Sequence, residues 1–381
     1  MTERHTIIFW LSDLSMHFSA TIRAMLDRGH EVVLVVEQEM LDDRLRMGWN
    51  VPDFGKAIIV VNSDRQQTDV TIRRYRPEKA IHILSGMRES YYRHIIHRLI
   101  ESKCLFGFYG EAPHPDGILV YPKKLVYTVL SIPLINYGCF FIALGHSSAD
   151  WFRNCGWDRK NVFECAYAVE QLSGSCRDKK LKNRESTSFE IIFVGRFLPI
   201  KRIDLALKAL SLQSNQNWHF TLIGDGPVKE EMVALASRLD MSHLVSFHDF
   251  MPNSEAIQHI AECDLLILPS VHEGWGAVVN EALMAGVRAI CSDQCGAADL
   301  VRDGEHGMVF RSGDVHSLAQ TLGEEIALGK QTEKNRAAVR AWSQCISGSS
   351  VADYMLAVLN HFYEGGDRPN PPWLRTKYKG S

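Results

Sequence analysis

The sequence predicts an α/β protein with two Rossmann-like, doubly wound domains that face each other across a cleft. Three observations predict this fold class. Short apolar runs alternate with helical patterns along the whole chain, which is typical of parallel sheets. The polar segment 171–188 has no apolar period and separates two such series, as a linker would. The length of 381 residues suits two or three domains.

The composition excludes several classes of protein. Hydrophobic residues make up 46% and charged residues 23%, as in an ordinary globular chain. The formal net charge of -3 argues against a nucleic-acid-binding protein, so we expect no nucleic-acid partner. The nine cysteines form no CxxC pair or Cys/His group at metal-ligand spacing, so we expect no metal and no disulfide framework. The apolar run Ile7–Leu11 is too short for a signal-peptide core, and we expect a cytoplasmic protein.

The first series of strands and helices predicts an N-terminal, Rossmann-like domain over residues 1–170. Helical patterns such as Thr21–Arg28 lie between most of its apolar runs. The predicted strands are His5–Leu11, Glu31–Val36, Ala57–Val61, Ala80–Leu84, Cys104–Phe108 and Phe140–Leu144.

The nearly uncharged segment Leu125–Leu144 has the length of a membrane span. Pro133, Asn136 and Gly138 interrupt it, so we predict a helix that ends near Asn136 and then a buried strand, both in the core. Lys123 and Lys124 precede this helix. They are either its solvated start or a contact with an anionic membrane surface, which would make the protein peripheral at the inner face of the cell membrane.

The second series predicts a C-terminal domain over residues 189–360. The segment 361–381 contains three prolines and is either a frayed tail or a stretch that crosses back to the first domain. Parallel sheets bind ligands beyond the carboxyl ends of their strands. The predicted strands are Ile191–Val194, His219–Ile223, Val245–His248, Leu265–Leu268 and Arg288–Cys291.

A cationic turn follows the first of these strands. Val194 ends the strand, Gly195 turns the chain, and Arg196 and Lys201 come before a helix that starts near Ile203. A guanidinium, an ammonium and a helix N-terminus together are suited to a diphosphate. The alternative is that these cations are solvated loop charges.

Two glutamates follow the strand Leu265–Leu268. Glu273 lies in the loop, where it can accept hydrogen bonds from sugar hydroxyls, and Glu281 lies in the next helix, where it can bind a ribose diol. Gly274 and Gly276 let the backbone approach a ligand at the helix N-terminus. The alternative is a pair of ordinary helix-terminal glutamates. The Gly-Asp-Gly-Pro sequence at 224–227 is typical of a structural turn.

From Ile191 to about Leu322 the chain resembles the donor-binding domain of retaining nucleotide-sugar glycosyltransferases of family 4. The resemblance implies the GT-B architecture, and in the N-terminal half it extends only to the architecture. The motifs that support it are FVGRFLPIKRID, LIGDGP, CDLLILPSVHEGWGAVVNEALMAG and AADLVRDGEHGMVF. The E-x7-E spacing of Glu273 and Glu281 is its most specific part.

The resemblance implies a role for each matching residue. Arg196 and Lys201 would bind the donor diphosphate, and Glu281 would bind the ribose. Glu273 would bind hydroxyls of the transferred sugar and belong to the catalytic set. Further donor contacts would be Gly274, Trp275 and Gly276 against sugar and phosphates, and the main chain of Met251 against the base.

The N-terminal half departs from the family pattern. The loop Leu11–His17 lacks the glycine pair of many relatives, which puts a phosphate contact from this side in doubt. Where relatives often carry a histidine, Glu111 is nearest, as a general base or as a negative charge beside an oxocarbenium-like transition state. His114 is the competing catalytic candidate. His82 and Arg88 are core or surface residues, or line an acceptor pocket.

The resemblance therefore implies an enzyme that transfers a sugar from a nucleotide-diphosphate donor to a hydroxyl, with retention at the anomeric carbon. The acceptor would be a glycan or a lipid-linked molecule, as in bacterial surface polysaccharide or glycoconjugate biosynthesis. No Asp-x-Asp run ends a strand, so we expect a metal-independent enzyme without a cofactor. The alternatives are a GT-B nucleotide-sugar epimerase and a non-catalytic nucleotide-sugar-binding subunit.

Overall fold

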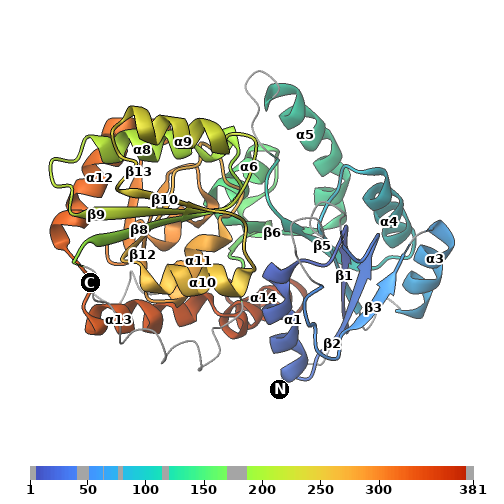
Figure 1. Cartoon of the computed structure of the whole chain (residues 1–381). Helices are drawn as coiled ribbons and strands as arrows, with labels where there is room; N and C mark the ends of the chain where they lie inside the picture. The colour runs from blue at the N-terminus through green and yellow to red at the C-terminus, as the bar shows by residue number, and fades with distance from the viewer. Residues whose placement is uncertain are drawn as a thin grey trace. The chain divides into compact units, whose positions relative to one another are not determined.

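The computed structural model describes residues 6–40, 51–62, 64–75, 80–113, 120–169 and 187–374. The chain divides into two compact units, Met1–Glu170 with Cys345–Ser381, and Gln171–Gln344 (Figure 1). Most of the predicted linker 171–188, the candidate His114 and the end of the segment 361–381 lie outside the described residues.

The first unit contains a parallel seven-stranded sheet with the order β3-β2-β1-β4-β5-β6-β7. Its strands are β1 Thr6–Leu11, β2 Glu31–Val36, β3 Ile58–Val61, β4 Ala80–Leu84, β5 Leu105–Gly110, β6 Phe140–Leu144 and β7 Val162–Cys165. Its helices are α1 Met16–Asp27, α3 Arg65–Arg74, α4 Ser90–Glu101, α5 Val120–Tyr137, α6 Gly145–Asn154 and α14 Gly348–Glu364, with the 3-10 turn η2 Arg159–Asn161.

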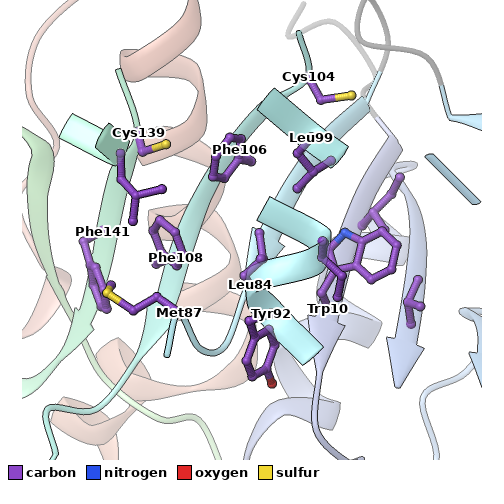
Figure 2. Packing of buried hydrophobic residues seen from close by; sticks show 14 of the residues in the cluster. Trp10, Leu84, Met87, Tyr92, Leu99, Cys104, Phe106, Phe108, Cys139 and Phe141 are labelled. Atoms are coloured by element: carbon purple, nitrogen blue, oxygen red, sulfur yellow. The ribbon is translucent and has the colours of Figure 1, made fainter. Parts of the chain in front are cut away.

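The core of this unit lies between the sheet and its helices (Figure 2). Trp10 of β1, Phe108 of β5 and Phe141 of β6 contribute large buried side chains, and α4 adds Tyr92 and Leu99. These apolar side chains occur in continuous runs along the strands, because helices cover a parallel sheet on both faces.

The second unit contains a parallel six-stranded sheet with the order β10-β9-β8-β11-β12-β13. Its strands are β8 Phe189–Val194, β9 Trp218–Ile223, β10 Val245–His248, β11 Leu265–Leu268, β12 Arg288–Ser292 and β13 Gly307–Phe310. Its helices are α8 Ile203–Ser211, α9 Lys229–Arg238, α10 Asn253–Glu262, α11 Ala277–Met284, α12 Val315–Leu328 and α13 Glu333–Ser343. Its 3-10 turns are η4 Pro199–Lys201, η5 Gly296–Leu300 and η6 Gln344–Ile346. The turn η6 lies at the boundary between the units.

The two parallel sheets with their helices confirm the predicted fold class. The strands β7 and β13 were not predicted. Both are four-residue strands at sheet edges, where a short apolar run gives a weak signal.

The chain returns to the first unit after α13. The sequence predicts that residues up to 360 belong to the second domain, whereas α14 packs along α1 in the first unit. Arg28 of α1 pairs with Asp353 of α14, and Gly348 lies against Ala20. Farther on, Arg368 donates hydrogen bonds to the backbone oxygen atoms of Lys160, at 2.7 Å, and Val162, at 2.6 Å.

The prediction that the whole apolar segment 125–144 belongs to the core is wrong for its helix. The strand β6 is buried, but α5 buries only Ser131 and Leu134 completely. The opposite face of α5 is exposed to solvent. Within the described residues, no helix combines the length and apolar character needed to cross a membrane.

Candidate functional site

The candidate site lies at the carboxyl ends of β8 and β11. These two strands are neighbours in the sheet, although β9 and β10 separate them in the sequence, and the strand order reverses between them. Loops that leave such a reversal point diverge to opposite faces of the sheet and open a crevice between them, which is where doubly wound folds bind ligands. The β8 loop contains Arg196 and Lys201, and the β11 loop contains Glu273.

Two glycine-rich turns pack tightly together at this edge. A Cβ atom on Gly224 would lie 1.9 Å from the backbone oxygen of Gly195, and one on Gly226 would lie 2.5 Å from that of Phe197. The amide of Phe197 donates to the backbone oxygen of Asp225 at 2.8 Å. The turn at 224–227 therefore packs closely against the β8 loop and supports it.

The two cations of the β8 loop have different environments. Arg196 is exposed. Lys201 ends η4 and is about four-fifths buried, and its ammonium donates to the Glu273 carboxylate. Arg202, in the left-handed conformation, starts α8 and pairs with Asp204. Lys201 and Glu273 thus connect the loops that follow β8 and β11.

Glu273 is held from several directions. Ser270 donates from its Oγ to Glu273 Oε2 at 3.1 Å. Along the backbone, the Glu273 amide donates to the oxygen of Gln294 at 3.1 Å, and the amide of Gly296 donates to the oxygen of Glu273 at 3.0 Å. Gly296 has to be glycine, because a Cβ atom there would lie 2.1 Å from the Gly274 oxygen. The carboxylate therefore has a fixed position beside the ammonium.

Trp275 supports this loop from inside the protein. We expected Trp275 to pack against the sugar and phosphates of the donor; in the structure the residue is only 2% exposed. Its Nε1 donates to Asn280 Oδ1 at 2.8 Å, and its backbone oxygen accepts from the Cys295 thiol and the Ala297 amide. Trp275 and Asn280 thereby anchor the start of α11 to the core.

The helix α11 begins directly after Gly276. This residue is the N-cap and has φ +95°, which favours glycine, and a Cβ atom would lie 2.8 Å from the Leu268 side chain. The amides of the first turn, beginning at Ala277, have no acceptor four residues earlier within the helix. The positive end of the helix dipole and these donors favour an anion here.

Glu281 lies one turn into the same helix and is buried. Burial raises the pKa of its carboxyl group to about 7, although a hydrogen bond from Asn253 opposes this increase. Asn253 Nδ2 donates to Glu281 Oε1 at 3.3 Å from the start of α10. Met251 lies two residues earlier, partly buried, in the loop between β10 and α10.

Sequence reasoning missed Ser270 and Asn253. Ser270 is a polar residue two positions after the end of the buried strand β11, a signal that could have indicated it. Asn253 follows Pro252 at the start of α10 and carries no comparable signal, because its partner Glu281 is 28 residues away in the sequence.

The candidates from the first unit have different environments. Glu111 is exposed directly after β5, and the amide of the next residue, Ala112, donates to Ser148 Oγ at 3.0 Å. His82 is fully buried in β4 and accepts a hydrogen bond from Trp10 Nε1 at 3.0 Å. Burial lowers the pKa of His82 to about 3, so it is a neutral core residue. Arg88 is half-exposed and pairs with Glu89.

A family model identifies the unit that holds the site. Residues 177–342 match the model described as glycosyl transferases group 1. This segment of the chain is therefore similar to glycosyltransferases of group 1. The matched segment includes all residues from Arg196 to Glu281 discussed above.

Three curated relatives share part of this sequence. The chain is 26% identical to an uncharacterized glycosyltransferase of Methanocaldococcus jannaschii over 66% of this chain and 75% of the relative. It is 26% identical to a D-inositol 3-phosphate glycosyltransferase of Mycolicibacterium gilvum over 45% of this chain and 40% of the relative. It is 31% identical to an exopolysaccharide phosphotransferase of Streptomyces coelicolor over 39% of this chain and 16% of the relative. For the last two, the chain covers less than half of the relative's length.

Solved structures share the fold across nearly the whole chain. A glycosyltransferase of Rickettsia africae matches with a TM-score of 0.72 at 12% identity, over 96% of this chain and 100% of that one. HepE of Anabaena in complex with UDP matches with a TM-score of 0.71 at 16% identity, over 93% and 99%. The lipopolysaccharide outer core galactosyltransferase WaaB matches with a TM-score of 0.66 at 15% identity, over 94% and 98%. These similarities show that the chain has the GT-B fold.

Proposed function

We propose that the chain is a retaining, metal-independent glycosyltransferase of family 4 that moves a sugar from a nucleotide-diphosphate sugar to a hydroxyl of a glycan or lipid-linked acceptor. The observation that supports this most strongly is the assembly at one sheet edge of Lys201, Glu273, the α11 N-terminus and Glu281. Each has chemistry suited to one part of such a donor.

The diphosphate is the leaving group, and negative charge develops on it as the sugar departs. Lys201 and the N-terminal end of α11 supply positive charge and hydrogen-bond donors from the loops after β8 and β11, and exposed Arg196 adds a planar guanidinium. In this mechanism Lys201 exchanges its bond to Glu273 for a bond to phosphate, or keeps both. Stabilisation of the leaving group by these residues is the reason for proposing metal independence.

The carboxylates bind the two sugars of the donor. Glu273, freed in part from Lys201, accepts hydrogen bonds from hydroxyls of the transferred sugar, while Ser270 keeps the carboxylate in place. Glu281 accepts bonds from the ribose hydroxyls, and these donors stabilise the charged form that burial disfavours. The backbone at Met251 would contact the base.

Transfer breaks the bond between the anomeric carbon and the diphosphate oxygen and forms one from that carbon to the acceptor oxygen. For retention we propose attack on the face from which the diphosphate leaves, and the acceptor proton passes to the leaving phosphate or to a base. Glu111 and His114 are the candidates for the base, and Glu111 is also a candidate for stabilising an oxocarbenium-like carbon.

The biological setting that we propose is the synthesis of a bacterial surface polysaccharide or glycoconjugate in the cytoplasm, at the inner face of the membrane. Two similar proteins are named as an exopolysaccharide phosphotransferase and a lipopolysaccharide outer core galactosyltransferase, which agrees with this setting.

The test is product analysis with UDP-, GDP-, ADP- and dTDP-sugars in EDTA, with and without a bacterial lipid extract as acceptor. We expect one donor to release its nucleoside diphosphate in an acceptor-dependent reaction, with the anomeric configuration retained in the product by NMR. A Glu273→Gln variant should lose this activity. An altered sugar on the intact donor, formed without acceptor, would instead identify an epimerase.

A further inference from the structure

The helix α5 presents an apolar face to solvent. Among the described residues, five of the fourteen exposed large hydrophobic side chains belong to this one helix. Contiguous exposed apolar surface of this kind marks an interaction site, whereas isolated exposed hydrophobic residues are ordinary. The five side chains are Tyr121, Leu125, Val126, Val129 and Ile132, with exposed fractions of 76%, 65%, 45%, 58% and 53%.

These side chains form one stripe along the helix. At 3.6 residues per turn, all the exposed residues of α5 fall within an arc of about 140°. The other three members of this arc are Pro122, Pro133 and Asn136, so the face contains no charged side chain. We call this set of eight residues the α5 face.

The opposite side of α5 is fixed to the core, so the α5 face is the outer side of an ordered helix. Ser131 Oγ accepts a hydrogen bond from the buried indole of Trp157 at 2.7 Å. Leu134 belongs to the core cluster, and Tyr137 donates from its hydroxyl to the backbone oxygen of Cys104 at 2.9 Å. The helix therefore cannot turn its exposed side inward without breaking these contacts.

The charge of the helix indicates what covers this face. Its 18 residues include Lys123 and Lys124 in the first turn and no acidic residue. Both lysines lie outside the apolar arc, partly buried at its margin. An apolar stripe bordered by lysines, with Tyr121 at one end, matches the headgroup region of a bilayer that contains anionic lipid.

We propose that the α5 face docks on an anionic membrane surface, with the helix lying in the interface plane and the lysines contacting lipid phosphates. This inference does not depend on glycosyl transfer, but it places the first unit where a lipid-linked acceptor would be presented. The helix is about 27 Å long at 1.5 Å per residue, so it offers an extended contact.

Flotation with vesicles tests the proposal without any donor or acceptor. The full-length chain is mixed with vesicles of pure phosphatidylcholine or of phosphatidylcholine with 30% phosphatidylglycerol. We expect wild type to float with the anionic vesicles. Leu125→Gln with Val129→Gln should abolish flotation, and Lys123→Glu with Lys124→Glu should weaken binding roughly 30-fold, from about fivefold for each lysine removed.

The matched control is Val70→Gln with Leu328→Gln, whose side chains are 54% and 68% exposed on other helices. This control should float like wild type. Absence of wild-type flotation, or equal flotation of the Leu125 and Val129 variant, would overturn the proposal. A wild-type dimer in sedimentation velocity that this variant dissociates, without vesicle binding, would also overturn it and assign the face to a second copy. Nucleotide-sugar binding, measured in parallel, separates this result from that of the proposed function.

Discussion

At the scale of single residues, the pairing of Lys201 with Glu273 compensates two buried charges. Both side chains are about four-fifths buried, where an unpaired charge would be costly. Each is the other's counter-ion, and Ser270 supplies a further donor to the carboxylate. In the proposed function, a donor molecule would bring phosphate for Lys201 and hydroxyls for Glu273, so both residues would keep partners when the ligand binds.

The buried carboxyl group of Glu281 should make the free energy of unfolding depend on pH. Because burial raises the pKa of its carboxyl group from 4.5 to about 7, the folded chain keeps this proton at pH 5 and must hold a buried charge at pH 8. The free energy of unfolding therefore falls as the pH rises between about 5 and 7, by about 3 kcal/mol for this group.

A Glu281→Gln variant should remove the free-energy cost of this buried charge. We expect urea unfolding to show stabilisation at pH 8, little change at pH 5, and weaker nucleotide-sugar binding. Glu325→Gln is the matched control, because Glu325 is equally buried but pairs with Arg288 at 2.6 Å and should lose stability at pH 8. Equal effects of Glu281→Gln at both pH values would contradict the account.

The sequence motifs indicated the candidate residues of the β8 and β11 loops but not the contacts that hold them. Arg196, Lys201, Glu273 and Glu281 are recognisable because each stands at a fixed spacing from a strand end. The burial of Trp275 depends on contacts with other elements, which no local pattern encodes. The same holds for the bond that Asn253 donates to Glu281.

At the scale of elements, the start of α11 depends on the lack of a side chain at Gly276. Gly276→Ala should displace the helix N-terminus, because the added Cβ atom meets Leu268 and Cys295 within 3 Å. The control is Gly304→Ala, since Gly304 has a similar φ of +83° but open space around it.

We expect Gly304→Ala to cost about 1 kcal/mol from backbone strain alone. Gly276→Ala should cost roughly 1 to 3 kcal/mol more, from overpacking, and should weaken donor binding. Denaturant unfolding and nucleotide titration measure the two effects. Equal costs for the two variants would show that the contacts around Gly276 do not position α11.

For α5, the sequence predicted the helix but not which of its sides is exposed. Its apolar residues are distributed around the helix, so the sequence lacks the period that distinguishes a buried face from an exposed one. The helix itself was predictable, and its end at Tyr137 lies one residue from the predicted position. Its orientation is set by Ser131 and Leu134, which only the fold brings against the core.

At the scale of the whole molecule, the chain contains two parallel sheets with the same order in their first four strands, and the sequence predicted both from alternating runs. The return of α14 to the first unit was not predicted for residues 345–360. Its apolar pattern would suit either unit, whereas the contact between Gly348 and Ala20 arises only when α14 meets α1.

Gly348→Ala should therefore destabilise the first unit. A Cβ atom there would lie 2.7 Å from Ala20, and we expect a loss of roughly 1 to 3 kcal/mol in the free energy of unfolding. Gly323→Ala in α12 is the control, because its Cβ atom would meet only the flexible end of Gln213. That control should be neutral or slightly stabilising. A neutral Gly348→Ala variant in denaturant unfolding would argue against close packing of α14 on α1.

The central claim is that the crevice at β8 and β11 binds a nucleotide-diphosphate sugar. The most direct measurement is a titration of UDP-, GDP-, ADP- and dTDP-sugars in EDTA against wild type, Lys201→Ala and the matched control Lys208→Ala, whose lysine pairs with Asp204 on the exposed side of α8. We predict that one nucleotide family binds. Loss of a charge-assisted contact of about 1.5 to 3 kcal/mol should weaken binding about 10- to 150-fold in Lys201→Ala only. No binding to wild type, or unchanged affinity in Lys201→Ala, would contradict the assignment of this site.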